Sequence, residues 1–183
     1  MSQSSSPAIR TTEAASIFLS TLTAGGNLAL SILVVPRLLE SPTPLMLRQW
    51  VNSYNLTKVM FPALGSLSGL SYLFLSYHHH HHHSSAAATK AKAYLGAGLL
   101  CLSVMPYTWA FILPTNRKIL RKAEEMRELK AVEGVEVEEQ GVGPRGEESA
   151  KWLVDHWGML NLPRGVATAV AGMLGLAATL RRV

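Results

Sequence analysis

The sequence has almost no cysteine and several long stretches without charge, and each absence limits the possible folds. The only cysteine among the 183 residues is Cys101, which excludes an intramolecular disulfide framework. No charged residue occurs within residues 14–35, 59–77 or 94–113. A helix crosses ~30 Å of hydrocarbon with about 20 apolar residues. The chain is therefore predicted to lie in a lipid bilayer, and its net charge of +5 does not indicate a nucleic-acid partner.

Four membrane spans are predicted, at about residues 14–35, 59–77, 94–113 and 159–180. The fourth is continuously apolar only from residue 165 to 180, so its full length requires Asn161 and Arg164 to lie inside it. Together they predict an all-α integral membrane four-helix bundle with both termini on one side. Residues 14–183 form a single predicted domain, with Cys101 as a packing residue. Residues 1–13 are Ser-rich and predicted to be disordered.

The connections between spans 1 and 2 and between spans 3 and 4 carry most of the basic residues. Pro44 suits a first helical turn, so a helix is predicted to start at Leu45 and continue into the second span. Residues 116–132 are predicted to form a short amphipathic helix near the headgroups, and residues 133–148 a mobile acidic loop. The positive-inside rule makes this side cytosolic and the side of the termini lumenal or external.

Six consecutive histidines, residues 78–83, follow the second span. A metal site needs a few ligands held in a fixed geometry, which a homopolymer run does not provide. An inserted affinity tag or a low-complexity loop is therefore favoured, both remain open, and no metal site is predicted.

Small and polar side chains recur at helical spacing within the spans. Span 1 carries Ser16, Ser20, Thr23, Asn27 and Ser31; span 2 carries Gly65 and Gly69 in a GxxxG motif; span 4 aligns Trp157, Asn161, Arg164, Thr168, Gly172 and Gly175. Helices in lipid associate through such residues, so these faces are predicted to meet other helices. Arg164 costs ~2.5–3.5 kcal/mol at the centre of a span, which indicates a functional role unless it snorkels to the headgroups.

The predicted topology gathers polar and aromatic residues at one end of the bundle. They are Trp50, Asn52, Tyr54, Asn55, Thr115, Asn116, Trp152, His156, Trp157, Asn161 and Arg164. Such a cluster at the mouth of an apolar bundle is suited to hold a small hydrophobic ligand. Among its members, His156 is the candidate base and Arg164 the candidate partner for an anion.

Three segments of the chain resemble the fungal anthrone oxygenases, which are small four-span membrane proteins of polyketide pathways. They are LRQWVNSYN before the second span, ILPTNRKIL at the end of the third, and WLVDHWGMLNLPRGV at the start of the fourth. The resemblance extends over nearly the whole chain in span order and loop length. It implies oxidation of an aromatic polyketide anthrone to an anthraquinone, with O₂ as co-substrate and no cofactor, in the endoplasmic reticulum or a related endomembrane.

The chemistry of an anthrone assigns expected roles to the polar cluster. His156 would remove the methylene proton, and Arg164, Asn116 or Tyr54 would stabilise the resulting anion. Trp50 and Trp157 would form flat walls against the rings. Asn161 and Thr115 complete the predicted substrate contacts. Two other functions stay open, a tetraspan accessory protein without chemistry and a carrier of a lipophilic metabolite, and the sequence does not fix the oligomeric state.

Overall fold

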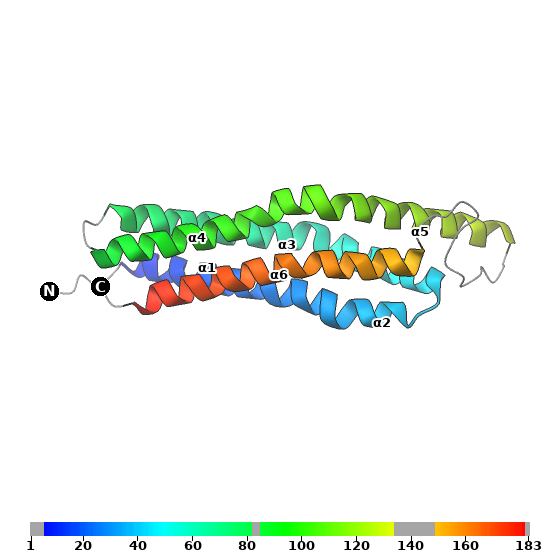
Figure 1. The fold of residues 1–183 in the computed structure, drawn as a ribbon, viewed down its shortest axis with the longest axis horizontal. Coiled ribbons are helices and arrows are strands. Elements are labelled where there is room, and N and C mark those ends of the chain that lie inside the picture. The colour runs from blue at the N-terminus through cyan, green and yellow to red at the C-terminus, as the bar shows by residue number, and fades with distance from the viewer. Residues whose placement is uncertain (1–5, 82–84, 134–148, 182–183) are drawn as a thin grey trace. The chain divides into compact units, whose positions relative to one another are not determined.

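The computed structural model describes residues 6–81, 85–133 and 149–181, which are almost entirely helical (Figure 1). Its elements are α1 (Pro7–Ala29), η1 (Leu30–Val34), α2 (Val35–Leu39), α3 (Thr43–His80), α4 (Ser85–Tyr107), η2 (Thr108–Ile112), α5 (Leu113–Glu133) and α6 (Ala150–Leu180). They join into four continuous helical rods that are long and apolar enough to cross a membrane: Pro7–Leu39, Thr43–His80, Ser85–Glu128 and Ala150–Leu180. The predicted all-α membrane architecture is confirmed.

The first helix begins earlier than the sequence suggested. Pro7 occupies the first turn of α1, where its missing N–H costs nothing, and the Ile9 amide donates to Ser6 Oγ over 3.4 Å. Residues 7–13 are consequently helical, which corrects the predicted disordered segment; residues 1–5 lie outside the described part of the chain. The predicted acidic loop also lies almost wholly outside it, at residues 134–148.

Two π-helical turns replace the breaks expected at prolines. η1 ends two residues before Pro36, and η2 ends two residues before Pro114. Proline has no N–H to donate and its ring collides with the carbonyl four residues back, so a wider turn keeps the helix continuous. As a result, α5 covers the helix predicted for residues 116–132 and continues the third rod.

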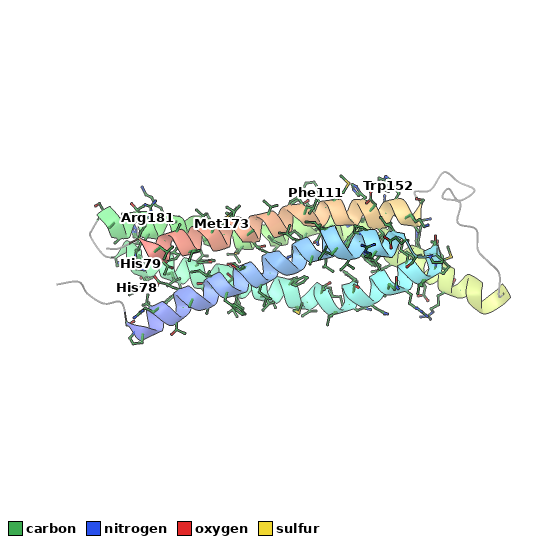
Figure 2. The ribbon with its side chains drawn as sticks, turned by 90° about the horizontal axis from the view of Figure 1, so that it is seen from below. His78, His79, Phe111, Trp152, Met173 and Arg181 are labelled. Atoms are coloured by element: carbon green, nitrogen blue, oxygen red, sulfur yellow. The ribbon has the colours of Figure 1, made fainter. Side chains whose placement is uncertain are left out.

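The rods are longer than the hydrocarbon of a bilayer. Helix α3 has 38 residues and is about 57 Å long, and it begins at Thr43, two residues before the predicted start. Its exposed large apolar side chains lie only between Leu56 and Tyr77. Side chains such as Phe111 and Met173 project outward in the same way from the other rods (Figure 2). About two fifths of α3 therefore extends beyond the lipid-facing zone.

The chain divides into two compact units. Unit 1 comprises Met1–Asn27, Met60–Pro106 and Arg164–Val183, and unit 2 comprises Leu28–Val59 and Tyr107–Pro163. Each contains a segment of all four rods and a core of its own. The core of unit 1 includes Tyr72, Leu75, Tyr94 and Ala97.

Small residues allow close helix packing within unit 1. A Cβ on Gly69 would lie 2.8 Å from Leu102, and one on Gly98 would lie 2.9 Å from Leu73, so α3 and α4 approach through these glycines. The predicted contact role is thus confirmed for Gly69, whereas a Cβ on Gly65 would meet nothing closer than 4.0 Å. Cys101 is buried in the same core, as predicted.

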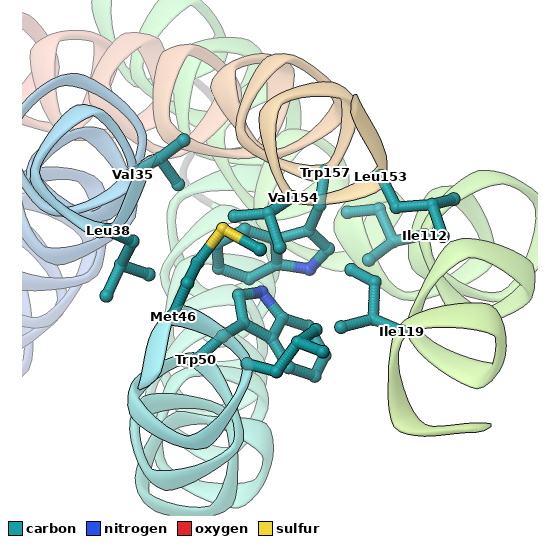
Figure 3. Packing of buried hydrophobic residues seen from close by; sticks show 10 residues of the cluster. Val35, Leu38, Met46, Trp50, Ile112, Ile119, Leu153, Val154 and Trp157 are labelled. Atoms are coloured by element: carbon teal, nitrogen blue, oxygen red, sulfur yellow. The ribbon is translucent and has the colours of Figure 1, made fainter. Parts of the chain in front are cut away.

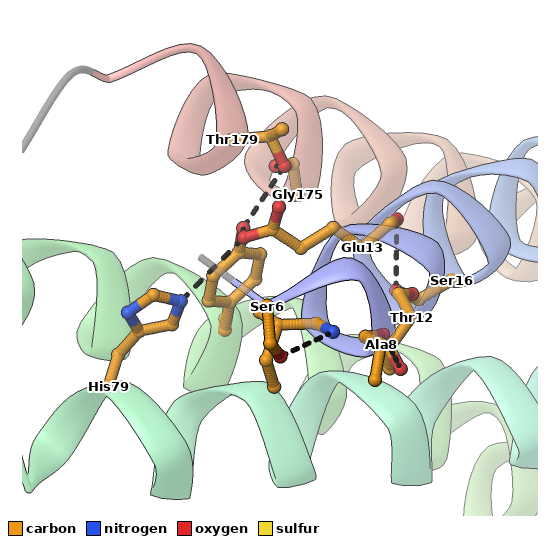
Figure 4. A network of polar contacts seen from close by, with 10 residues as sticks. Ser6, Ala8, Thr12, Glu13, Ser16, His79, Gly175 and Thr179 are labelled. Carbon is orange, nitrogen blue, oxygen red and sulfur yellow. Dashed lines mark hydrogen bonds and ion pairs between the residues drawn. The ribbon is translucent and has the colours of Figure 1, made fainter. Parts of the chain in front are cut away.

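Unit 1 also holds a buried polar network that the sequence did not reveal (Figure 4). The Tyr94 hydroxyl donates to Glu13 Oε1 over 2.8 Å and lies 3.0 Å from the Thr179 hydroxyl. His79 Nε2 lies 3.6 Å from the same carboxylate oxygen, and its ring stacks on Tyr94. The first three histidines of the run lie in α3, which corrects the expectation of a loop for that part, and His79 is packed, with 8% of it exposed.

Candidate functional site

Unit 2 is built around two buried tryptophans. Trp50 on α3 stacks on Tyr54 one turn later, with ring centroids 5.1 Å apart and planes 8° apart. Trp157 on α6 meets Trp50 edge to face at 5.5 Å and 82°. Apolar side chains from all four rods pack around the pair (Figure 3): Val35, Leu38, Met46, Leu47, Ile112, Ile119, Leu153 and Val154. We call this set of ten residues the tryptophan core.

The tryptophan core contains polar atoms without partners. The indole nitrogens of Trp50 and Trp157 are buried and have no hydrogen-bond acceptor among the described residues. Figure 3 shows them on the facing sides of the two rings. The Oδ1 atom of Asn116, on α5 in the same unit, is also buried without a donor in the described part of the chain. Buried polar groups are normally hydrogen-bonded, so these three atoms are candidates for contact with a polar atom of a ligand.

A groove of about 590 Å³ lies against one side of this core. Leu47 and Val51 of α3 and Leu120, Ala123 and Met126 of α5 line it, and each belongs to the tryptophan core or packs on it. Its polar lining consists of Arg48, Asn52, Glu124 and Arg127. This volume is typical of small-molecule sites. The groove can therefore accept a flat aromatic ligand on an apolar floor.

All predicted site residues except Arg164 belong to unit 2. Trp50, Tyr54 and Trp157 are brought into ring contact, and Thr115, Asn116 and Asn161 are buried. His156 is half-buried, and its ring stacks on Trp152 (Figure 2), with the ring centroids 4.8 Å apart. The predicted site residues do not line the groove itself.

Sequence reasoning missed the charged side chains of the groove. Glu124 and Arg127 form an ion pair with an N···O distance of 3.4 Å. Both side chains are exposed, as expected for the solvent-facing helix predicted from the sequence. The sequence spacing does place the groove residues of each helix on one face. These are residues 120, 123, 124 and 127 of α5 and residues 44, 47, 48 and 51 of α3. What the sequence could not provide was the fact that these two faces oppose each other.

Arg164 lies in unit 1, where it lines a small pocket with Thr23, Asn27 and Thr168. It is buried, with 8% of its surface exposed, so it does not snorkel freely to the headgroups. The described residues contain no cluster of three or more histidine, cysteine or acidic side chains that could hold a metal ion.

Comparison with known proteins assigns the chain to a family. The anthrone oxygenase profile matches residues 50–174, which include every predicted site residue. Anthrone oxygenase dmxR16 of Cryptosporiopsis sp. is 28% identical over 107 residues, covering 57% of this chain and only 58% of that protein. Anthrone oxygenase nsrD of Aspergillus novofumigatus is 26% identical over 165 residues, 87% of each chain. A Claviceps purpurea anthrone oxygenase is 25% identical over 169 residues, 89% of this chain and 84% of the relative. No solved structure matches. The chain belongs to the anthrone oxygenase family.

Proposed function

We propose that this protein oxidises an anthrone of an aromatic polyketide pathway to the anthraquinone with O₂ and without a bound cofactor. Membership of the family supports the reaction class, and the groove beside the tryptophan core supports a planar aromatic substrate. The proposed location is an endomembrane such as the endoplasmic reticulum, with the groove on the cytosolic side.

The chemistry requires little from the protein beyond proton transfer and charge stabilisation. The methylene of an anthrone lies between two aryl rings, so loss of one proton gives an electron-rich, phenolate-like anion. This anion passes an electron to O₂, the radical pair couples to a peroxide, and loss of water gives the quinone. One anthrone and one O₂ yield one anthraquinone and one water, and no external reductant is consumed.

Unit 2 offers groups for each of these needs. The apolar floor of the groove would hold the rings, and Arg48 and Arg127 would attract the oxyanion at its rim. The N–H groups of Trp50 and Trp157 could stabilise charge on the carbonyl oxygen after a local rearrangement of the core. His156, the sequence-predicted base, remains our proposal for the proton acceptor, and Glu124 is the only carboxylate among the residues that line the groove.

The single observation that carries the proposal is the groove beside the buried, unpartnered indole donors. The test is to incubate the protein, purified in detergent, with an anthrone under air and under argon, and to follow quinone formation and O₂ uptake. Equal amounts of quinone formed and O₂ consumed, with none under argon, are expected. A carrier would bind anthrone without O₂ uptake, and an accessory protein would do neither.

A matched pair of variants locates the reaction in the groove. Ala123→Leu adds bulk to the groove, whereas Ala63→Leu adds the same bulk at an exposed position on α3. We expect Ala123→Leu to raise the KM for anthrone and Ala63→Leu to leave it unchanged. Equal KM values for both variants and the wild type would place the substrate elsewhere.

A further inference from the structure

Three aromatic rings lead from the interior of unit 2 to its surface, and we call them the aromatic row. The ring centroids of Trp157 and Trp50 are 5.5 Å apart (Figure 3), and those of Trp50 and Tyr54 are 5.1 Å apart. Both indoles are buried, whereas Tyr54 is half-buried. All three residues belong to unit 2, so the row joins its core to its surface through direct ring contacts.

The outer end of the row lies where α3 leaves the lipid-facing zone. The first exposed large apolar side chain of this helix is Leu56, two residues after Tyr54. Exposed polar side chains lie beside the tyrosine: Lys58 Nζ is 5.5 Å from the centroid of the Tyr54 ring and donates to Asn55 Oδ1 over 2.8 Å. Water at the level of the headgroups therefore reaches this end of the row and is available to accept the phenol proton.

The inner end of the row is an unfavourable place for a positive charge. The indole nitrogens of Trp50 and Trp157 have no hydrogen-bond acceptor within the part of the chain that the structure describes. When Trp50 loses one electron, the radical cation thus has no neighbouring base for its N–H proton, and an unpaired charge in an apolar core is strongly disfavoured. An electron from Tyr54 removes this charge, so the row favours outward movement of the oxidised state.

We propose that the aromatic row carries oxidising equivalents out of the tryptophan core and thereby protects the core from oxygen-derived radicals. The source of these radicals rests on the proposed function, because the O–O bond of the peroxide formed there can break homolytically into an alkoxyl and a hydroxyl radical. Oxygen added to a buried indole would place a polar group in a tightly packed apolar core. A radical on Tyr54 instead lies at the surface, within reach of water-soluble reductants.

The transfer conserves atoms and electrons. An alkoxyl radical takes one electron from Trp50 and becomes an alkoxide, and Trp50 regains an electron from Tyr54. The phenol proton passes through water to the alkoxide. The products are one alcohol and one tyrosyl radical, and Trp50 is restored. Because Tyr54 loses an electron and a proton together, its ring stays neutral and the nearby Lys58 ammonium does not oppose the step.

A laser flash that ejects an electron from indole tests the route without turnover. The parent protein carries Trp109→Phe and Trp152→Phe, at positions that are 72% and 47% exposed. The only tryptophans left in it are Trp50 and Trp157. We expect the absorption of the indole radical to decay while that of a tyrosyl radical rises. Tyr54→Phe keeps the stacked ring but removes the oxidisable phenol, so the delayed tyrosyl rise should be lost.

Tyr107→Phe in the same parent is the matched control. Tyr107 also packs on the tryptophan core and is half-buried, but its ring lies against Phe111, with centroids 5.0 Å apart. This variant should keep the delayed rise. A rise that persists in Tyr54→Phe, or one that disappears in Tyr107→Phe, would overturn the route.

Oxidation of the core during turnover tests the protective role. After equal numbers of turnovers with an anthrone under air, peptide mass spectrometry should find more added oxygen on the two tryptophans of the row in Tyr54→Phe than in the wild type or Tyr107→Phe. Equal oxidation in the three proteins would refute protection even where the flash experiment shows the route. A wild type that consumes no O₂ with any anthrone would refute the proposed function and this source of radicals, while the flash experiment would still decide the route.

Discussion

The Tyr94 hydroxyl and the Glu13 carboxylate are joined by a buried hydrogen bond of 2.8 Å between residues 81 positions apart in the sequence. The bond ties α1 to α4 within unit 1, and the Thr179 hydroxyl adds α6 to the same cluster. A buried carboxylate is tolerated only when it is paired and hydrogen-bonded. The integrity of this cluster should therefore govern the stability of unit 1 and leave substrate binding in unit 2 unchanged.

Removal of the Tyr94 hydroxyl tests this dependence. Tyr94→Phe should lower the free energy of unfolding by about 1–3 kcal/mol, because Glu13 then stays buried with one hydrogen bond fewer. Thermal unfolding in detergent measures the effect. Tyr77→Phe is the matched control, since 66% of Tyr77 is exposed. Equal melting temperatures for the two variants would show that the network does not stabilise the protein.

The histidine run should contribute to stability through one of its members. His79→Ala is expected to lower the melting temperature, because His79 contacts both Glu13 and Tyr94, while His80→Ala at an exposed position should not. Turnover per folded molecule should be unchanged in both, and also after deletion of residues 78–83. A loss of turnover together with a loss of bound metal would contradict the proposal of cofactor-free chemistry.

The indole donors of the tryptophan core can be removed without removing an aromatic ring. Trp50→Phe should lower kcat at least about tenfold if the N–H stabilises the anthrone oxyanion. Its stability should fall less than burial alone suggests, because the wild-type N–H has no acceptor among the described residues. Trp109→Phe, at a site that is 72% exposed, serves as control. A strongly destabilised Trp50→Phe with normal kcat per folded molecule would assign the tryptophan to packing only.

His156 and Glu124 are the two candidates for the general base that removes the methylene proton. His156→Ala should lower kcat by about 10²–10⁴-fold, and the loss should shrink at high pH, where the anthrone ionises without help. Glu124→Gln should leave kcat close to that of the wild type. Rates are compared per monodisperse molecule in detergent. The opposite pattern, a slow Glu124→Gln and a normal His156→Ala across the pH range, would move the base into the groove.

Much of this fold is predictable because a membrane-spanning helix needs a long apolar stretch, and such stretches can be identified directly in the sequence. Uncharged stretches locate the four rods, and the polar stripe of span 1 predicts its inward face, since Ser16, Ser20, Thr23 and Asn27 are all buried. The starts and ends of the rods are less visible. Prolines normally end helices, but the π-turns before Pro36 and Pro114 let two rods continue through them.

The candidate site was only partly predictable, because the sequence shows which end of the bundle a residue occupies but not how each helix is rotated. Topology placed Trp50 and Trp157 at the same end of the bundle, and the structure brings them into contact. The groove, in contrast, depends on which face of α5 opposes α3, which is a property of the rotation of each helix and not of its composition. Arg164 illustrates a second limit: the boundary between the two units falls directly before it, and hydropathy gives no sign of that boundary.

The length of α3 determines where a ligand would enter and leave. The lipid-facing apolar side chains of this helix end at Leu56, and Arg48 lies eight residues earlier on the same continuous helix, about 12 Å farther along its axis. A molecule in the groove would thus exchange with the aqueous layer beside the headgroups and would not need to cross the bilayer. If the proposed function holds, the anthrone would arrive and the quinone would leave at the membrane surface.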